Sequence, residues 1–272
     1  SESKNINGNV EFSYNLFTGW GSIYTFQKLK KQSNLKSTEL LLQMEQVLIR
    51  TAKQYYVIAY LQEQNKILIE LLNVSENRYK RIKVQNEFGN ASKLDLLSAE
   101  IDLNKDSVNV INSKYELNIA KDQLKLILNT ELNDDFIVDN QVQINTNLNY
   151  KELDKQIADN NNNIIFQQYL IEIAKKDKKI NSVSILPKVN FSAQYGYNNT
   201  ESNTSLILDQ TSLGLTGFIN FSWDIFDGLA RRKVTQNMQI QVESNILELT
   251  AIKQKIQKEF NSTFQHYSNS IN

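Results

Sequence analysis

The chain has 272 residues, with 30 basic and 30 acidic side chains, one proline and eight glycines, a composition typical of a helix-rich protein. A formal net charge of zero provides none of the positive field on which nucleic-acid binding relies, so no nucleic-acid partner is expected. Cysteine is absent and histidine occurs once, which excludes disulfides and any metal site built from cysteine or clustered histidine.

The first recognisable element is an alternating stretch that begins at Val10. Residues 1–9 are polar and rich in Asn and Gly, which predicts a loop before it. Along residues 10–16 apolar side chains alternate with Glu11, Ser13 and Asn15, the pattern of a strand with one apolar and one polar face. Gly19 predicts a turn after this strand, with a helix beginning near Trp20.

Residues 22–86 contain neither proline nor glycine, and apolar residues recur there at helical spacing. The pattern predicts one helix of about 95 Å, far longer than the mean helix of a globular domain. Such a helix needs a partner along its side.

A second helix is expected to return along the first. A turn with Gly89 at its centre leads to Ser92, which is predicted to be the N-cap, with Asp95 three residues later. The second helix is expected to end near Leu128. Apolar residues spaced by three, four and seven predict its packing seam: Leu94, Leu97, Ile101, Val108, Ile111 and Tyr115.

The segment after the hairpin changes character. Residues 129–163 are rich in Asn and Asp and predict an irregular segment with short elements, followed by a helix that Pro187 ends. The shorter return helix requires another segment to cover the rest of the first helix. Four lysines in residues 175–179 favour a solvated helix face over a binding patch. A second strand then carries Asn190, Ser192 and Gln194 on its polar side, and a polar loop is expected over residues 199–213.

The opening strand and turn occur twice in the sequence. Residues 219–228 align with residues 10–19 without a gap, at an offset of 209. Four positions are identical: Phe12, Ser13, Phe17 and Gly19 match Phe221, Ser222, Phe226 and Gly228. Gly19 and Gly228 mark the joint between strand and helix in each copy, and Phe17 and Phe226 are expected to pack there. The second copy places Asn220, Ser222 and Asp224 on the polar side and predicts a helix from about Leu229 to the end. This self-similarity is architectural.

Two explanations fit the strands. An ordinary antiparallel sheet would put one face on a core and one in water. A membrane barrel would put the apolar face in lipid and the polar face around a water-filled lumen. The strands alone favour the first explanation, but the sequence predicts no amphipathic helix of ordinary length to cover the apolar face. Three strands cannot close a barrel, so a barrel would require oligomerisation.

Other features are less specific. Trp20 and Trp223 lie near strand ends, where a membrane barrel has an aromatic girdle, although core packing explains each equally well. No apolar run reaches the 18 to 20 or so residues of a membrane-spanning helix. No catalytic triad, phosphate loop or metal spacing is present, so the sequence predicts neither an enzyme nor a cofactor.

Taken in order, these units resemble the TolC-type outer-membrane efflux proteins. The resemblance rests on the aromatic-Ser-x-x-Leu/Ile-Phe-x-Gly unit at residues 12–19 and 221–228, on the turn at residues 89–99, and on Leu186-Pro187-Lys188-Val189 before the second strand. It implies a mainly helical fold with a small β part: a long antiparallel helical hairpin coiled coil joined to transmembrane barrel strands, the strand–helix unit being repeated at 209 residues.

The resemblance also implies where each segment lies. Residues 1–19 would be an outer-membrane strand and loop, residues 20–128 a long periplasmic hairpin, and residues 129–163 an irregular equatorial segment. Residues 164–187 would form a periplasmic helix, residues 188–228 outer-membrane strands, and residues 229–272 the start of a second long helix. By comparison with the family pattern, we expect a leader, a first strand and a second hairpin that this sequence does not contain.

The implied function is passive export through a homotrimeric duct in the bacterial outer membrane with a periplasmic extension. The duct would join a periplasmic adaptor and an inner-membrane pump, in a tripartite efflux or type I secretion system. Adaptor contact is expected at the hairpin turn: Gly89, Asn90, Ala91, Ser92, Leu94, Asp95, Leu96, Leu97 and Ala99. The lumen would be lined by Glu11, Ser13, Asn15, Asn190, Ser192, Gln194, Asn220, Ser222 and Asp224.

Two other functions compete with the channel. A periplasmic adaptor (membrane fusion protein) also has a long helical hairpin, but it would not repeat a strand–Gly–helix unit at 209 residues. A structural coiled-coil protein would have no reason to carry three strands with aromatic faces.

Overall fold

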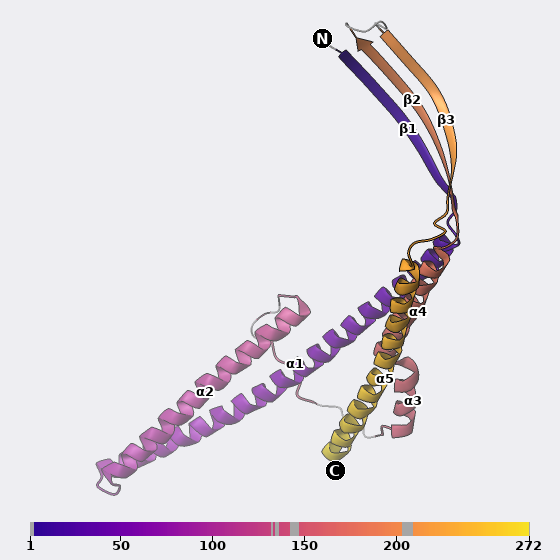
Figure 1. Cartoon of the computed structure of the whole chain (residues 1–272). Helices are drawn as coiled ribbons and strands as arrows, with labels where there is room; N and C mark the ends of the chain where they lie inside the picture. The colour runs from indigo at the N-terminus through magenta and orange to yellow at the C-terminus, as the bar shows by residue number, and fades with distance from the viewer. Residues whose placement is uncertain (1–2, 132, 134–135, 142–146, 203–208, 272) are drawn as a thin grey trace. The chain divides into compact units, whose positions relative to one another are not determined.

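The computed structural model describes residues 3–131, 133, 136–141, 147–202 and 209–271. In chain order, its elements are β1 (Ser3–Phe17), α1 (Gly21–Glu87), α2 (Lys93–Leu128), α3 (Tyr150–Asn160), α4 (Asn162–Val183), β2 (Lys188–Ser202), β3 (Asp209–Ser222) and α5 (Ala230–Ile271) (Figure 1). The predicted class, long helices with a small antiparallel sheet, is confirmed. The chain divides into two units, Ser1–Leu40 with Asn149–Asn272 and Leu41–Leu148, and α1 contributes to both.

The sheet has the order β1-β2-β3, and both pairs are antiparallel. Its strands are longer than predicted. Residues 3–9, 199–202 and 209–213 belong to strands, so the loops predicted over residues 1–9 and 199–213 were wrong for these residues. The rest of those loops, residues 1–2 and 203–208, lies outside the described residues. The polar composition suggested loops, but continuous pairing with a neighbouring strand satisfies the backbone of these segments.

The hairpin unit joins α1 to α2. The inward stripe of α2 is buried or half-buried and alternates steps of four and three: Ala99, Leu103, Asp106, Val110, Ser113, Leu117, Ala120 and Leu124. The facing stripe of α1 alternates in the same way: Ile58, Leu61, Asn65, Leu68, Leu72, Ser75, Tyr79, Ile82 and Asn86. This spacing is that of a coiled-coil seam. The predicted helical hairpin is confirmed.

The seam predicted for α2 was wrong. All six of its residues are exposed, from 53% at Leu97 to 76% at Leu94. Both stripes repeat every seven residues, but the inward one uses small and polar residues such as Ala99 and Ser113, which let α2 approach α1 closely. We call the exposed set, Leu94, Leu97, Ile101, Val108, Ile111 and Tyr115, the outward stripe. The more apolar stripe of α2 therefore faces away from its own hairpin.

A short extended segment completes the core of the hairpin unit. Val138 is 6% exposed and packs with Ile58, Leu117 and Leu124. Both backbone polar groups of Val138 bond the amide of Gln62, at 3.1 and 3.2 Å. The segment after α2 is thus held against the hairpin by side chains of α1.

The other unit holds the sheet and α3, α4 and α5. Here α4 lies beside the first turns of α1, through ion pairs Lys28–Asp177 and Lys31–Glu172, both 2.6 Å. A later segment therefore lies beside the first turns of α1, whereas residues 43–50 of the same helix are exposed. On α5, residues spaced by three and four face inward, with Val242 only 5% exposed.

Residues 129–163 include the short helix α3, in line with the irregular segment with short elements that the sequence predicts. Helix α4 begins at Asn162, two residues before the predicted start at residue 164. Tyr150, the first residue of α3, packs its ring against Phe260 and Phe264 at centroid distances of 5.0 and 5.2 Å. Asn149 and Asn161 cap α3 and α4. The Asn-rich composition therefore reflects helix capping as well as loop.

Over the described part of the chain, no helix combines the length and the apolar character needed to cross a bilayer.

Candidate functional site

The two strand–helix joints use the same backbone device. Gly19 and Trp20 have φ of 61° and 67°, and α1 begins at the next residue. Gly228 and Leu229, 209 residues later, have φ of 65° and 68°, and α5 begins at the next residue. Two consecutive left-handed residues turn the chain sharply, and Gly takes the first of them without strain. The sequence repeat is therefore a repeat of backbone conformation.

The residue before each glycine caps the helix that follows. Oγ1 of Thr18 accepts a hydrogen bond from the backbone N–H of Ser22 at 3.2 Å. At the equivalent positions, Oδ2 of Asp227 accepts from the N–H of Arg231 at 2.9 Å. That bond and the Arg231 guanidinium together hold the pKa of Asp227 below its usual value. Both caps satisfy an N–H that has no partner within its own helix.

The glycines differ in their surroundings. A Cβ on Gly19 would lie 2.8 Å from Cβ of Leu186, in the link between α4 and β2, and 2.9 Å from the carbonyl oxygen of Val183, the last residue of α4. A Cβ on Gly228 would have nothing within 4 Å. Glycine is therefore required at position 19 both by the left-handed conformation and by the close approach of Leu186 and Val183. At position 228 only the left-handed conformation requires it.

The phenylalanines of the two joints also differ. Phe17 is half-buried and contacts Trp20 edge-to-face at 5.8 Å. Phe226 is 79% exposed, so the expectation that it packs at the joint within this chain was wrong. Trp20 and Trp223 are both more than half exposed.

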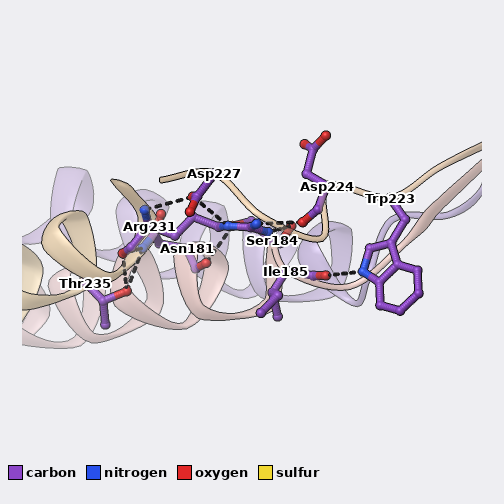
Figure 2. A network of polar contacts seen from close by, with 8 residues as sticks. All are labelled: Asn181, Ser184, Ile185, Trp223, Asp224, Asp227, Arg231 and Thr235. Carbon is purple, nitrogen blue, oxygen red and sulfur yellow. Dashed lines mark hydrogen bonds and ion pairs between the residues drawn. The ribbon is translucent and has the colours of Figure 1, made fainter. Parts of the chain in front are cut away.

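Arg231 connects the second joint to the end of α4 (Figure 2). Its guanidinium donates to Oδ2 of Asp227 at 2.7 Å, to the carbonyl oxygen of Asp224 at 2.6 Å and to that of Ser184 at 3.3 Å. Close by, the indole N–H of Trp223 donates to the carbonyl oxygen of Ile185 at 2.9 Å. The chain entering β2 and the chain leaving β3 are thus bonded to each other where the sheet meets the helices.

The sheet gathers most of the predicted lumen residues on one face. Partners in an antiparallel register point to the same side, and Asn15, Asn190 and Asn220 form one such row. Nδ2 of Asn190 bonds Ser13 at 3.2 Å and Asn15 at 3.0 Å. By the same register, Glu11, Ser192, Gln194 and Ser222 share this face.

Two residues depart from this arrangement. Phe218 pairs with Ser192 and places an aromatic side chain on the polar face. Asp224 lies beyond the end of β3, so the strand register assigns its side chain to neither face. Its carbonyl oxygen accepts from Arg231.

The opposite face is apolar and uncovered. Val10 and Tyr195 form one row with Leu215, and Tyr14 and Phe191 form another with Ile219. Val10, Leu215 and Ile219 are 72%, 73% and 69% exposed. A soluble sheet of this length normally buries one face. The apolar face therefore needs an apolar environment that the described chain does not supply.

The hairpin turn has the predicted cap. Oγ of Ser92 accepts from the N–H of Asp95 at 3.1 Å, and the Asp95 carboxylate accepts from the N–H of Ser92 at 3.0 Å. The Ser92 hydroxyl also donates to the Asp95 carboxylate, at 2.6 Å. This bond, followed by the one from the Ser92 N–H, lowers the pKa of Asp95. Gly89 has a φ of 75°, and Nδ2 of Asn86 bonds the carbonyl oxygen of Ala91 at 2.8 Å.

The turn exposes large apolar side chains. Phe88, Leu94 and Leu97 are 77%, 76% and 53% exposed. Ala99 is 1% exposed and faces α1, so the prediction that it belongs to this contact surface was wrong. The remaining predicted residues, Gly89, Asn90, Ala91, Ser92, Asp95 and Leu96, surround the exposed leucines and are exposed or half-buried.

Arg231 was missed by the sequence analysis, although a signal was present. Thr18 and Asp227 are both good helix caps at the same position of the repeat, which points to residues 22 and 231 as their partners. Among the described residues, no group of three or more His, Asp or Glu side chains is arranged to hold a metal ion.

No protein-family model and no curated protein matches this sequence. Solved structures do match its fold. A membrane protein from Pseudomonas aeruginosa has a TM-score of 0.75 and 12% identity over 98% of this chain and 66% of its own. The outer membrane protein VceC from Vibrio cholerae has a TM-score of 0.67 and 11% identity over 92% of this chain and 66% of its own.

A third match is the CmeC outer membrane channel from Campylobacter jejuni, with a TM-score of 0.69 and 11% identity over 93% of this chain and 60% of its own. The chain spans slightly less than two thirds of the length of the channels it matches. At these identities the likeness is one of fold, and it confirms the resemblance at that level. The chain has the fold of the TolC-type outer-membrane efflux proteins.

Proposed function

We propose that this chain is a subunit of an outer-membrane export channel. One observation carries the proposal: the sheet is apolar on one face and polar on the other, and the apolar face is exposed. Strands of 14 and 15 residues extend about 45–50 Å, which is more than the roughly 30 Å of a bilayer's hydrocarbon core. Lipid is the apolar environment that such a face fits, and the Asn, Ser and Gln side chains then line water.

The number of strands supports a closed assembly of several copies. β1 and β3 are sheet edges within the described chain, and lipid-exposed edges are not tolerated in a membrane. The outward stripe of α2 supports the same conclusion, because a second heptad stripe requires a second helical neighbour. We propose a homotrimer, in which copies close both the barrel and a helical tunnel that extends into the periplasm.

We further propose that the hairpin turn meets a periplasmic adaptor that joins an inner-membrane pump. The turn is fixed by the Ser92–Asp95 capping box, and it presents Leu94 and Leu97 to solvent. Leu97→Asp is expected to keep full conductance in a bilayer while abolishing dye efflux from cells. Glu100→Gln, at an exposed position three residues on, is the control. An equal loss of dye efflux in both variants would contradict adaptor binding at the turn.

The channel itself is tested by reconstitution. Protein extracted in non-ionic detergent should have the mass of a trimer by native mass spectrometry and should conduct ions across a planar bilayer. A monomer without conductance would contradict the proposal. If the protein instead bound a separate outer-membrane channel and conducted nothing itself, the adaptor function would replace it.

A further inference from the structure

A cleft lies along one face of α4, between α1 and α5. Its volume is about 910 Å³. Helix α4 lines most of it, and Lys31 of α1 and Gln239, Val242 and Ile246 of α5 complete the lining. The proposed transport function does not use this cleft.

The cleft holds five ammonium groups and one carboxylate. Lys31 pairs with Glu172 at 2.6 Å, which raises the pKa of Lys31. Lys176 and Lys178 reach to either side and donate to neutral glutamine oxygens, Oε1 of Gln27 and of Gln239, both at 2.7 Å. Neutral acceptors fix the position of an ammonium group without placing a carboxylate beside it. The ammonium group of Lys176 also lies over the ring of Tyr24, 5.8 Å from its centroid.

Lys175 and Lys179 are exposed at the rim, and no described residue pairs with either ammonium group. The sequence favoured a solvated helix face for these four lysines. The structure differs, because two of the four bridge to neighbouring helices and leave a hollow between them. The resulting positive charge attracts anions into a partly enclosed space.

The floor of the cleft is apolar. Val242 is 5% exposed and Ile246 is 43% exposed. The methylene stems of the lysines add apolar surface below their charged ends. A volume of this size falls within the usual range for small-molecule sites. An inorganic anion would leave the floor in contact with water, and a neutral apolar compound would not use the lysines.

We propose that this cleft binds an amphiphilic organic anion. Its acidic head lies between Lys175 and Lys179, and its apolar body lies on Val242 and Ile246. The ligand is either a free organic anion or the head and upper chain of an anionic lipid. The inference stands apart from the channel proposal, because binding can be measured in protein that conducts nothing.

Isothermal titration of the purified protein in dodecyl maltoside tests the cleft with octyl phosphate. Lys175→Gln/Lys179→Gln is expected to weaken binding at least tenfold, and Lys175→Arg/Lys179→Arg to keep it within threefold. The control Lys253→Gln/Lys258→Gln removes two exposed charges of α5 outside the cleft and should leave binding unchanged. Ile246→Ser should abolish the preference for octyl phosphate over inorganic phosphate.

Three outcomes would overturn the proposal: no saturable binding, equal weakening by the control variant, or equally tight binding of inorganic phosphate and octyl phosphate. Dihexanoyl phosphatidylglycerol in the same titration distinguishes the sources. If it binds at the cleft at least as tightly as octyl phosphate, the ligand is a lipid; if it does not bind, the ligand is a smaller anion. Conductance of the same samples reports separately on the channel.

Discussion

Arg231 and Asp227 form an ion pair at the first turn of α5, with 2.7 Å between Nε and Oδ2, and the same carboxylate oxygen caps the backbone N–H of Arg231. The guanidinium also bonds two backbone carbonyl groups on opposite sides of the sheet–helix boundary. One side chain therefore connects the end of α4, the end of β3 and the start of α5. The first joint has the equivalent cap, Thr18, without such a cation.

Arg231→Ala should loosen the second joint. The substitution leaves the carbonyl groups of Asp224 and Ser184 without this donor, and we expect Tm to fall by at least about 3 °C. Amide hydrogen exchange should accelerate around residues 184–186 and 224–231. Arg232→Ala, at the exposed neighbouring position, is the control. Equal effects of the two substitutions would show that the Arg231 network does not hold the joint.

The two joint glycines should respond differently to alanine. Gly228→Ala places a Cβ in open space at positive φ and is expected to cost about 1–2 kcal/mol of unfolding free energy. Gly19→Ala bears the same conformational cost and also forces Leu186 and Val183 to move, so it should cost more. Asn tolerates the left-handed region, so Gly228→Asn should recover part of the loss while Gly19→Asn recovers none. Urea unfolding measures all four; equal costs at the two positions would contradict the close approach at Gly19.

Acid should weaken the hairpin turn through Asp95. Because the folded state lowers the pKa of Asp95, the capping box stabilises the turn above the unfolded pKa of about 3.9 and loses this effect as pH falls through the folded value. Exchange protection of residues 93–96 should therefore decrease between pH 6 and pH 2.5. Asp95→Asn should remove most of this pH dependence, while Glu100→Gln should keep it.

Ser92→Ala should destabilise α2 by about 1 kcal/mol at neutral pH. If neither Ser92→Ala nor Asp95→Asn changed protection of these amides at neutral pH, the capping box would not hold the turn.

Substitutions in the inward stripe of α2 should reduce the stability of the folded chain, and substitutions in the outward stripe should weaken the oligomer. Leu117→Ala removes a side chain that is 9% exposed and should cost about 2–4 kcal/mol of unfolding free energy. Ile111→Ala removes one that is 63% exposed, so its effect on the isolated chain should stay within about 0.5 kcal/mol. Ile111→Ala should instead lower the fraction of oligomer seen by native mass spectrometry. If Ile111→Ala left the oligomer intact while Leu117→Ala dissociated it without unfolding, the two assignments would be reversed.

Local signals predicted much of this molecule. The alternation around Val10, the glycine turns and the Ser92–Asp95 pair are short-range patterns, and short-range physics decides them. The seam of α2 could not be chosen this way, because two stripes share the same period and the outward one is more apolar. Its choice depends on which neighbour each stripe meets, and Ala99 and Ser113 face α1 because small side chains allow close packing. The extent of β1 also depended on pairing with β2, which no local pattern contains.

The alternation of the sheet gives the most direct test of the channel. The chain has no cysteine, so single cysteines can be placed without background. Ser13→Cys lies on the polar face and Val10→Cys on the apolar face. In a planar bilayer, a charged, membrane-impermeant methanethiosulfonate should reduce the conductance of Ser13→Cys and leave that of Val10→Cys unchanged. The opposite pattern, or no conductance from either variant, would contradict a lipid-facing apolar side and a water-filled lumen.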